Sequence, residues 1–406
     1  MIVIAIGLVI GAILFWPNPG NGKANIRKPD VSLPDDQSVD FEKLLKDTCP
    51  ATSDQYLVVG AGFLGSKLIH ALLLRGEKRV RAFDIDPNAL APELRDHPHL
   101  EFIQGDVTKL ADIQAACQDV DTVYCTFAII RYFERLPAYA ELSERINVGG
   151  TDRVLEACVA QGVKRLVHTS TSNVCAAPTL VNMAMSEESP YVTRDTSPNH
   201  YGWTKALAEQ RVLEANGKDG MVTGSIRPCS GIFGRRDKMN LERLFKDRQA
   251  MMVKPRAYMD YVFVDNVAWG HLLLERAMQD GNQSVAGQAF CVGNEEPMSS
   301  EDFYFTAKAF IPNLKVNYMP FVFVRLLAHG VETMQRFIPF KLTPDKVGDL
   351  AICSPAMLDT CMTYVFKSTK AKDVLGYQPI YTVDQGIQKS LREYEAGRIL
   401  PPIHSS

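Results

Sequence analysis

The amino-acid sequence predicts an α/β protein centred on a doubly wound parallel sheet, with a smaller C-terminal lobe and an N-terminal hydrophobic helix. Three observations support this class. Short β-branched segments alternate with helical ones from residue 55 onward, a glycine-rich turn follows the first of them, and residues 1–16 are apolar throughout. Strands and helices that alternate at this spacing require right-handed crossovers, which produce a parallel sheet with helices on both faces.

The composition is that of an ordinary globular protein: 46% of the 406 residues are hydrophobic, 22% are charged, and the formal net charge is −3. It excludes a disordered chain, a collagen-like fibre and a polytopic membrane protein. The near-neutral charge, without a long basic run, argues against nucleic acid as the main partner. The nine cysteines include no C-x-x-C pair and the eight histidines are scattered. We therefore expect reduced structural thiols and no metal site.

Residues 1–16 form an apolar run without a charged side chain. As a helix the run would be about 24 Å long, slightly short of the roughly 30 Å hydrocarbon core of a bilayer. It lacks the basic start and the A-x-A cleavage site of a signal peptide. Lys23, Arg27 and Lys28 follow it, which favours a cytosolic location for the rest of the chain. We predict a single membrane anchor; a cleaved signal peptide and a peripheral or core segment are the alternatives.

Residues 17–53 lack apolar periodicity and are predicted to be a flexible linker, with one helical turn near residues 41–46. Beyond the linker, strands are predicted at 55–59, 79–85, 101–104, 122–125 and 165–169. Helices are predicted at 66–75, 109–117 and 138–161. We place the sheet domain at 54–230. A smaller lobe, interleaved with elements that return to the sheet, is placed at 231–398.

A G-x-G-x-x-G motif directly follows the first predicted strand and opens a helix. It consists of Gly60, Ala61, Gly62, Phe63, Leu64 and Gly65. The first glycine permits a tight turn, the second lets the backbone approach a pyrophosphate, and the third allows close helix packing. The unpaired N–H groups and the dipole of the helix N-terminus favour phosphate binding. Glycines mark many turns, but this position between strand and helix predicts a Rossmann-type dinucleotide-binding domain.

Acidic residues at two strand ends are candidates for contacts with the adenosine half of a dinucleotide. Asp84 ends the second predicted strand, 19 residues after Gly65, where a carboxylate can accept hydrogen bonds from the ribose. Its charge would repel a 2′-phosphate, which predicts NAD in preference to NADP. A cap or turn aspartate before Pro87 is the alternative. Asp106 and Val107 follow the third strand and either contact the adenine or form a simple turn.

Tyr201 and Lys205 lie four residues apart, so a helix would place them on one face. An ammonium near the phenol favours the tyrosinate and suits it to proton transfer near neutral pH. A solvated helix face is the common explanation of such a pair. Upstream, Ser170 and Thr171 follow a buried-looking strand and offer a hydroxyl to a substrate oxygen, unless they are an ordinary polar strand end. Behind a dinucleotide fold, the two features together indicate catalysis.

These segments resemble the extended short-chain dehydrogenases/reductases, in particular their 3β-hydroxysteroid dehydrogenase branch. The resemblance covers roughly residues 55–395. Its motifs are G-A-G-F-L-G, Q-G-D-V-T (104–108), N-V-G-G-T (147–151), H-T-S-T-S-N-V (168–174), Y-G-W-T-K (201–205), I-R-P (226–228) and Y-V-F-V-D-N-V-A-W-G-H (261–271). Several motifs in this order are specific for the superfamily, and the last one points to the sterol branch.

The resemblance implies roles for the residues of the Tyr-Lys region. Tyr201 would be the proton acceptor during alcohol oxidation. Lys205 would bind the nicotinamide ribose and lower the pKa of Tyr201. Thr171 occupies the position of the family's catalytic hydroxyl, where serine is the commoner residue, and Ser170 is the reserve candidate.

Three further residues follow from the same resemblance. Asn147 would either help to position the active site or only cap and pack its helix. Pro228 would approach the nicotinamide. Ala128 would contact the cofactor, although its segment departs from the family pattern. Because the family commonly dimerises through two helices, the resemblance also allows a homodimer.

The implied reaction is hydride transfer from a secondary alcohol to the nicotinamide, which leaves a ketone. When a 4α-carboxylate stands beside a 3β-hydroxyl, the product is a β-keto acid, which loses CO₂ through an enolate. The resemblance therefore implies a sterol-4α-carboxylate 3-dehydrogenase (decarboxylating) of sterol biosynthesis, held in the endoplasmic reticulum membrane with its catalytic domain in the cytosol. The alternatives are a 3β-hydroxysteroid dehydrogenase/Δ5-Δ4 isomerase, a reductase of phenolics or sugar nucleotides, and an inactive NAD(H)-sensing protein.

Residues 318–340 are strongly apolar but are interrupted by Arg325, Glu332 and Arg336, so they are too polar to span a membrane. We predict a helix pair here. It either covers the substrate pocket and touches the membrane surface or forms part of the core of the C-terminal lobe.

Overall fold

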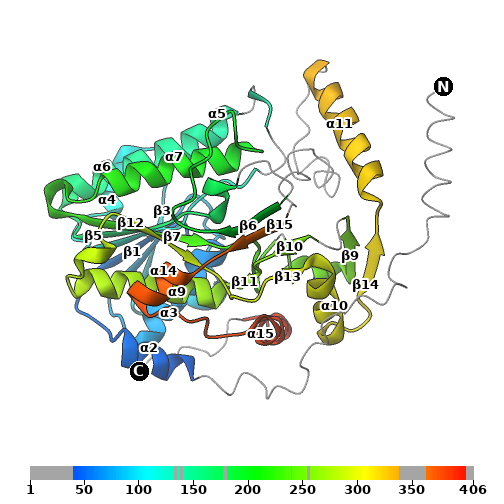
Figure 1. The fold of residues 1–406 in the computed structure, drawn as a ribbon. Coiled ribbons are helices and arrows are strands. Elements are labelled where there is room, and N and C mark those ends of the chain that lie inside the picture. Colours follow the sequence, from blue (N-terminus) through cyan, green and yellow to red (C-terminus); the bar gives the residue numbers. More distant parts are fainter. Residues whose placement is uncertain are drawn as a thin grey trace.

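A seven-stranded parallel sheet forms the centre of the computed structural model, which describes residues 40–131, 135–137, 140–176, 181–238, 240–253, 257–337 and 363–398 (Figure 1). Its strands run in the order β12-β7-β5-β4-β1-β2-β3. They are β1 (Tyr56–Val59), β2 (Val80–Asp84), β3 (Leu100–Gln104), β4 (Thr122–Cys125), β5 (Arg165–Thr169), β7 (Val222–Pro228) and β12 (Gln288–Val292). The predicted doubly wound parallel sheet is confirmed.

Helices cover both faces of this sheet (Figure 1). On one face lie α3 (Phe63–Arg75), α9 (Val264–Gln279) and α14 (Thr369–Leu375); on the other lie α4 (Leu110–Ala116), α6 (Gly150–Gln161) and α7 (His200–Glu214). Every residue of β1 and of β4 is buried. A strand covered on both faces needs apolar side chains at successive positions, which explains the continuous apolar sequence of β1.

The helix predicted at 138–161 is interrupted. It consists of α5 (Ala140–Ser143), a π-helical turn (Glu144–Gly149) and α6. A π-helical turn holds one residue more than an α-helical turn would, and it changes the direction in which the side chains around it point. In this turn, Asn147 is almost fully buried.

A short helix, α2 (Phe41–Thr48), packs against α3 at the N-terminal side of the body. Phe41, Leu45 and Cys49 are buried, and the Asp40 carboxylate accepts a hydrogen bond from the Lys43 N–H. The range predicted as linker, 17–53, therefore contains a packed helix where a single turn was expected. The predicted anchor, residues 1–16, lies outside the described residues. Among the helices that are described, none has both the length and the apolar character needed to cross a bilayer.

The smaller lobe contains a four-stranded sheet in the order β13-β10-β15-β6. Its strands are β6 (Val181–Met185), β10 (Tyr258–Met259), β13 (Met298–Ser299) and β15 (Thr363–Phe366). Two further strand pairs, β8 (Ile232–Phe233) with β11 (Val262–Phe263) and β9 (Gln249–Met252) with β14 (Lys315–Tyr318), belong to the same part of the chain. The lobe is not one continuous segment, because β6 precedes residue 230 whereas α9 and β12 return to the large sheet.

The remaining helices are α8 (Glu242–Asp247), α10 (Ser300–Phe310), α11 (Phe321–Phe337) and α15 (Val383–Ala396). Where a helix pair was predicted within 318–340, the described part is the single helix α11, which follows β14. Val324 and Ala328 are fully buried, but Val322 and Leu326 are each 69% exposed and Phe337 is 82% exposed. The outward face of α11 therefore lies outside the core.

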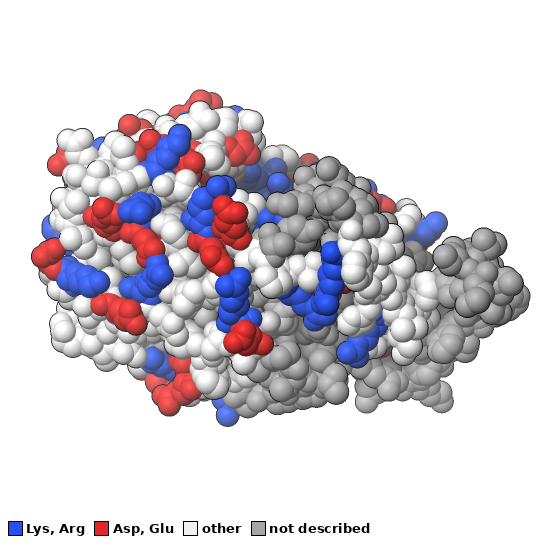
Figure 2. Space-filling view, turned by 90° about the horizontal axis from the view of Figure 1, so that it is seen from above, with Lys and Arg blue, Asp and Glu red and all other residues white. Residues whose placement is uncertain are grey.

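On the face shown in Figure 2, Lys and Arg alternate with Asp and Glu over the sheet body instead of gathering by sign. A face of this kind presents no broad field of one sign to a large charged partner.

Candidate active site

The strand order of the large sheet reverses between β1 and β4, and ligands of such sheets bind outside the carboxyl ends of the strands at this point. The N–H groups of Thr126 and Phe127 both donate to the Val59 carbonyl, at 2.9 and 3.0 Å, which fixes the end of β4 beside the end of β1. A cavity of about 1030 Å³ opens there. Its volume is at the upper end of the range found for small-molecule sites, about 300–1,000 Å³.

The glycine loop forms the floor of this cavity. Gly60 has a φ of +101°, and a Cβ on it would lie 2.5 Å from the Phe127 nitrogen. A Cβ on Gly65 would lie 1.9 Å from the Gly60 oxygen. At Gly62, the residue that precedes α3, a Cβ would meet no atom within 4 Å. Gly60 and Gly65 are thus required by the protein's own packing. Gly62 leaves open space at a helix N-terminus, which fits a pyrophosphate.

Asp84, Asp106 and Val107 line the cavity at the ends of β2 and β3. The Asp84 carboxylate accepts hydrogen bonds from the N–H groups of Ala61, at 2.9 Å, and Asp86, at 3.0 Å, so it is fixed beside the glycine loop. Asp106 forms a turn in which its carboxylate accepts from the Thr108 N–H and hydroxyl, and the first of these bonds lowers its pKa. Both expectations for Asp106, the turn and a place in the cavity, are therefore compatible.

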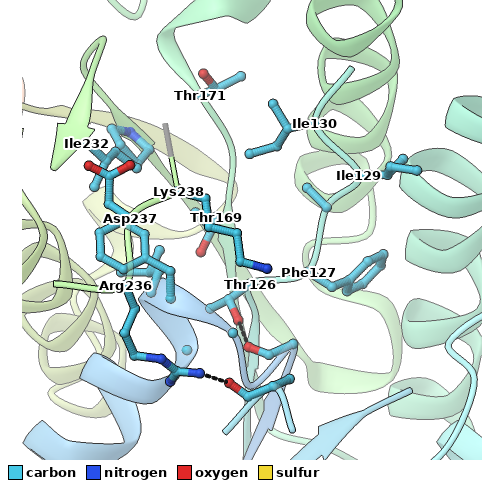
Figure 3. A pocket seen from close by; sticks show the side chains of 18 of the residues that line it. Thr126, Phe127, Ile129, Ile130, Thr169, Thr171, Ile232, Arg236, Asp237 and Lys238 are labelled. Carbon is cyan, nitrogen blue, oxygen red and sulfur yellow. Dashed lines mark hydrogen bonds between the residues drawn. The ribbon is translucent and has the colours of Figure 1, made fainter. Parts of the chain in front are cut away.

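The loop after β4 forms an apolar wall with Phe127, Ala128, Ile129 and Ile130 (Figure 3). Asn147 stands behind this wall. Its Oδ1 accepts from the Ile129 N–H at 2.8 Å, and its Nδ2 lies 3.1 Å from both the Ile129 oxygen and the Thr204 Oγ1. Asn147 therefore connects the loop after β4 to α7 through hydrogen bonds and does not itself line the cavity.

Thr171 and Tyr201 line the same cavity, although 30 residues separate them. The Asn199 side chain caps α7 by accepting from the Gly202 N–H at 2.9 Å, which sets Tyr201 in the first helical turn. Tyr201 is 6% exposed and Thr171 is 7% exposed. Ser170 and Pro228, at the ends of β5 and β7, also line the cavity.

Lys205 lies one turn after Tyr201 on α7 and is 2% exposed. Its Nζ donates to the Thr169 carbonyl at 2.7 Å and lies 3.1 Å from the His168 Nε2. Burial lowers the pKa of Lys205 to about 8, against the influence of Cys125 and Glu209, which raise it. The side chain therefore remains largely protonated at neutral pH.

Several cavity residues come from the lobe and were not predicted: Ile232, Arg236, Asp237, Lys238, Met259 and Tyr364. The Arg236 guanidinium reaches the opposite side of the cavity, where it donates to the Ser66 Oγ at 3.0 Å and to the Ala89 carbonyl at 2.7 Å (Figure 3). The strands that carry Ile232, Met259 and Tyr364 are only two to four residues long, which is too short for a periodic signal. Arg236, Asp237 and Lys238 lie in the turn that follows β8. The charged run at residues 235–238 was the one usable indication in the sequence.

The seven cysteines in the described part of the chain are buried and free. Within the same residues, no three His, Cys, Asp or Glu side chains are grouped so as to hold a metal ion.

A doubly wound sheet with a glycine loop at its switch point is the architecture of a dinucleotide-binding enzyme. Comparison with known families identifies the class of enzyme more closely. The model of the 3-beta hydroxysteroid dehydrogenase/isomerase family matches residues 57–311. The chain belongs to this family and is an NAD(P)-dependent oxidoreductase of the short-chain dehydrogenase/reductase type.

Three relatives match over most of their length. Short-chain dehydrogenase/reductase family 42E member 1 of Mus musculus is 32% identical over 346 residues, 79% of this chain and 82% of its own. The 3 beta-hydroxysteroid dehydrogenase/Delta 5-->4-isomerase of Mycobacterium tuberculosis is 33% identical, over 82% and 88%. Sterol-4-alpha-carboxylate 3-dehydrogenase, decarboxylating, of Mus musculus is 30% identical, over 83% and 90%.

Among solved structures, the UDP-glucose 4-epimerase of Thermotoga maritima superposes with a TM-score of 0.63. It is 17% identical and covers 84% of this chain and 99% of its own. At this identity the likeness establishes the fold.

Proposed function

We propose that this protein oxidises the 3β-hydroxyl of a sterol with NAD, and that the preferred substrate carries a 4α-carboxylate that is then lost as CO₂. The observation that carries the proposal is the meeting of Tyr201, Thr171 and the glycine loop around one cavity, with Lys205 directly behind.

The residues of the chain divide the work as follows. The Thr171 hydroxyl holds the substrate oxygen, and the Tyr201 oxygen accepts the hydroxyl proton. The Lys205 ammonium favours the tyrosinate and binds the nicotinamide ribose. The bound nicotinamide supplies the hydride acceptor. Ser170 is the reserve for Thr171, and Asn147 supports the site through Ile129.

The cofactor contacts follow the cavity from end to end. The N-terminus of α3 at Gly62 binds the pyrophosphate, and Asp84 accepts hydrogen bonds from the adenosine ribose. Because the Asp84 carboxylate would repel a 2′-phosphate, NAD is preferred to NADP. Ala128 and Pro228 border the nicotinamide end.

The walls of the cavity support a sterol as substrate. Phe127, Ile129, Ile130, Ile232 and Met259 give it a broad apolar lining, as a fused-ring hydrocarbon requires. Oxidation beside a 4α-carboxylate would give a β-keto acid, whose carbonyl takes up the electron pair released when CO₂ leaves. The sterol-4-alpha-carboxylate 3-dehydrogenase of Mus musculus and the 3 beta-hydroxysteroid dehydrogenase of Mycobacterium tuberculosis are both named for oxidation at position 3.

A 3β-hydroxysteroid dehydrogenase with Δ5→Δ4 isomerase activity is the second candidate. It is favoured by the name of the Mycobacterium tuberculosis relative. Isomerisation requires an additional acid or base at the steroid, beyond the Tyr-Lys pair.

The test is turnover by the full chain in detergent with NAD or NADP. A 4α-carboxysterol and a Δ5-3β-hydroxysteroid are offered separately, and Tyr201→Phe runs beside the wild type. We expect NADH formation with CO₂ release from the carboxysterol and a loss of at least about 100-fold in kcat for Tyr201→Phe. Turnover of only the second substrate, with formation of a conjugated enone, would favour the isomerase. Failure of both substrates would refute the sterol assignment.

We further propose that residues 1–16 anchor the protein in the endoplasmic reticulum membrane and that the outward face of α11 rests on the cytosolic surface of that membrane. Val322, Leu326 and Phe337 give this face an exposed apolar surface. Arg325 and Arg336 are exposed along the same helix, where they can meet anionic headgroups.

The membrane proposal predicts two separable attachments. The full chain should resist carbonate extraction from microsomes. Deletion of residues 2–16 should leave a protein that carbonate or high salt releases, and adding Leu326→Glu should make it soluble at low salt. Leu207→Glu, at a position that is 37% exposed on α7, is the matched control and should not change the distribution. Retention on membranes of the protein that lacks residues 2–16 and carries Leu326→Glu would contradict the role of α11.

A further inference from the structure

A buried array of polar side chains stands behind Tyr201, contributed by β5, α7 and α9. It consists of His168, Thr169, Lys205 and His271, none of which is more than 8% exposed. The Lys205 Nζ is 3.1 Å from the His168 Nε2 and 2.7 Å from the Thr169 carbonyl. The Thr169 hydroxyl is 2.7 Å from the His271 Nε2. The mechanism described above uses Lys205 but gives no function to either histidine.

We propose that His168 is a positioning residue that holds the Lys205 ammonium by accepting a hydrogen bond at Nε2, and that His271 fixes the second acceptor through Thr169. The inference rests on the proposed role of Lys205. It adds a residue whose contribution is made through Lys205 and not through contact with substrate or cofactor.

The donor and acceptor roles of His168 follow from its partners. A lysine ammonium only donates, so the His168 Nε2 accepts and its proton is on Nδ1. Burial, with the nearby Lys205 charge, holds the pKa of His168 well below its usual value, so the ring stays neutral. Within the described residues, the His168 Nδ1 has no hydrogen-bond partner. The ring is thus retained in the core although it leaves one polar atom unsatisfied, a cost expected to be offset at its other nitrogen.

The second acceptor is fixed from the other face of β5. The His271 Nδ1 lies 2.8 Å from the Val267 carbonyl, which can only accept. Nδ1 therefore donates, and the His271 Nε2 accepts from the Thr169 hydroxyl. Because successive side chains of a strand point to opposite faces, His168 meets α7 while Thr169 meets α9. His271, the last residue of the motif at 261–271, thereby holds Thr169 at the end of β5, and the Thr169 carbonyl accepts the hydrogen bond from Lys205.

Together the two acceptors determine how the ammonium is oriented. Two of its three N–H groups point to His168 and to the Thr169 oxygen, and tetrahedral geometry then fixes the third. The other groups that act on Lys205 are Cys125 from β4 and Glu209 from α7, both of which favour its charged form. Neither supplies a hydrogen bond to Nζ in the described residues, so His168 is the side chain that directs it.

The test measures Lys205 itself, without cofactor or substrate. NMR of the full chain carrying lysine labelled with ¹³C at Cε, recorded at a series of pH values and assigned with Lys205→Arg, gives the midpoint at which the Lys205 Nζ loses its proton. We expect a midpoint near 8 in the wild type. In His168→Phe the buried ammonium loses an acceptor, so the midpoint should fall by about one pH unit. His168→Gln, whose amide oxygen can accept, should restore most of the shift.

Two further comparisons keep the test decisive. His97→Phe, in a half-buried turn far from the site, should leave the midpoint of Lys205 unchanged. His168→Leu repeats the removal of the acceptor and replaces the phenylalanine variant if that one does not fold. An unchanged midpoint in a folded acceptor-free variant would overturn the proposal.

Kinetics separate this inference from the proposed function. If the sterol assignment holds, the alkaline limb of kcat for His168→Phe should move to lower pH by the same shift, while KM changes less. If no sterol reacts but the titration midpoint of Lys205 still shifts, the positioning role stands and the proposed function fails.

Discussion

Gly62 and Gly65 stand three residues apart at the start of α3, yet their surroundings differ completely. The space beside Gly62 is open to the cavity, whereas the space beside Gly65 is filled by the Gly60 carbonyl. A glycine at position 62 is therefore explained by a ligand, and a glycine at position 65 by the packing of the fold.

This difference predicts opposite outcomes for two alanine substitutions. Gly62→Ala should change the free energy of unfolding by less than about 1 kcal/mol, but it should weaken NAD binding about tenfold or more, because the methyl group occupies the place of the pyrophosphate. Gly65→Ala should destabilise the fold by about 2 kcal/mol or more through overpacking. Thermal unfolding and calorimetric titration with NAD measure the two effects. Equal losses of stability in the two variants would contradict the assignment.

The sequence predicted the cavity residues that belong to recognisable motifs. Asp84 and Thr171 line the cavity because parallel strands and their following turns meet at one edge of the sheet, and Tyr201 lines it from the first turn of α7. Tyr364 could not be found in this way, and the charged run at residues 235–238 was the only local sign of Arg236. They depend on packing between the lobe and the sheet body, and neither periodicity nor a local motif encodes such contacts.

At the scale of single elements, β5 and α9 are joined by a hydrogen bond between Thr169 and His271 that depends on a neutral histidine. Burial lowers the pKa of His271 to about 4, below the usual value near 6.5. In the unfolded chain His271 takes up a proton as the pH falls below 6.5, while in the folded protein it does not. Stability from this group is therefore complete above pH 6.5 and is lost as the pH falls from 6.5 to 4.

We expect this loss to be measurable by urea unfolding. Between pH 7.5 and pH 5, His271 should reduce the free energy of unfolding by about 2 kcal/mol. His271→Gln does not titrate in this range, so its stability should fall by about that much less. The same pH dependence in the variant and the wild type would show that His271 is not the responsible group.

Prediction succeeded for elements whose pattern is long or repeated and failed for those defined by tertiary contact. The strands β1 to β5 were found because each is a β-branched or apolar run between turns. The helix α2 was assigned to the linker because its apolar positions, Phe41 and Leu45, are too few to establish a period. The strand β6 joins a sheet whose other strands lie at least 70 residues later, a pairing without local signal.

At the scale of the whole molecule, a buried charge network joins the N-terminal and C-terminal parts of the described chain. Lys67 on α3 lies 2.6 Å from Glu393 on α15 and 3.2 Å from Asp265 on α9. Lys389 on α15 lies 2.6 Å from the same aspartate. Although burial alone would raise the pKa of Asp265, the two ammonium groups hold it well below its usual range. The two lysines and the two carboxylates balance in charge.

Breaking this balance should destabilise the protein as a unit. Lys389→Met leaves a surplus negative charge in the core, so we expect the free energy of unfolding to fall by about 3–5 kcal/mol. Lys46→Met removes one partner of an exposed pair with Glu42 and is the matched control, with a loss of less than about 1 kcal/mol. Thermal and urea unfolding measure both variants. A loss for Lys389→Met no larger than that of the control would show that the network contributes little.

The π-helical turn at residues 144–149 has a consequence for how this chain can change in length. Because the turn holds one residue more than an α-helical turn, deleting one residue from it would restore regular helix with α5 and α6 still in their present relative orientation, and the side chains inside the turn would shift to new positions. The Asn147 amide would then no longer meet Ile129 and Thr204 together. We infer that this segment tolerates replacement of its exposed side chains far better than a single-codon deletion, so the register of the turn is inherited as a unit.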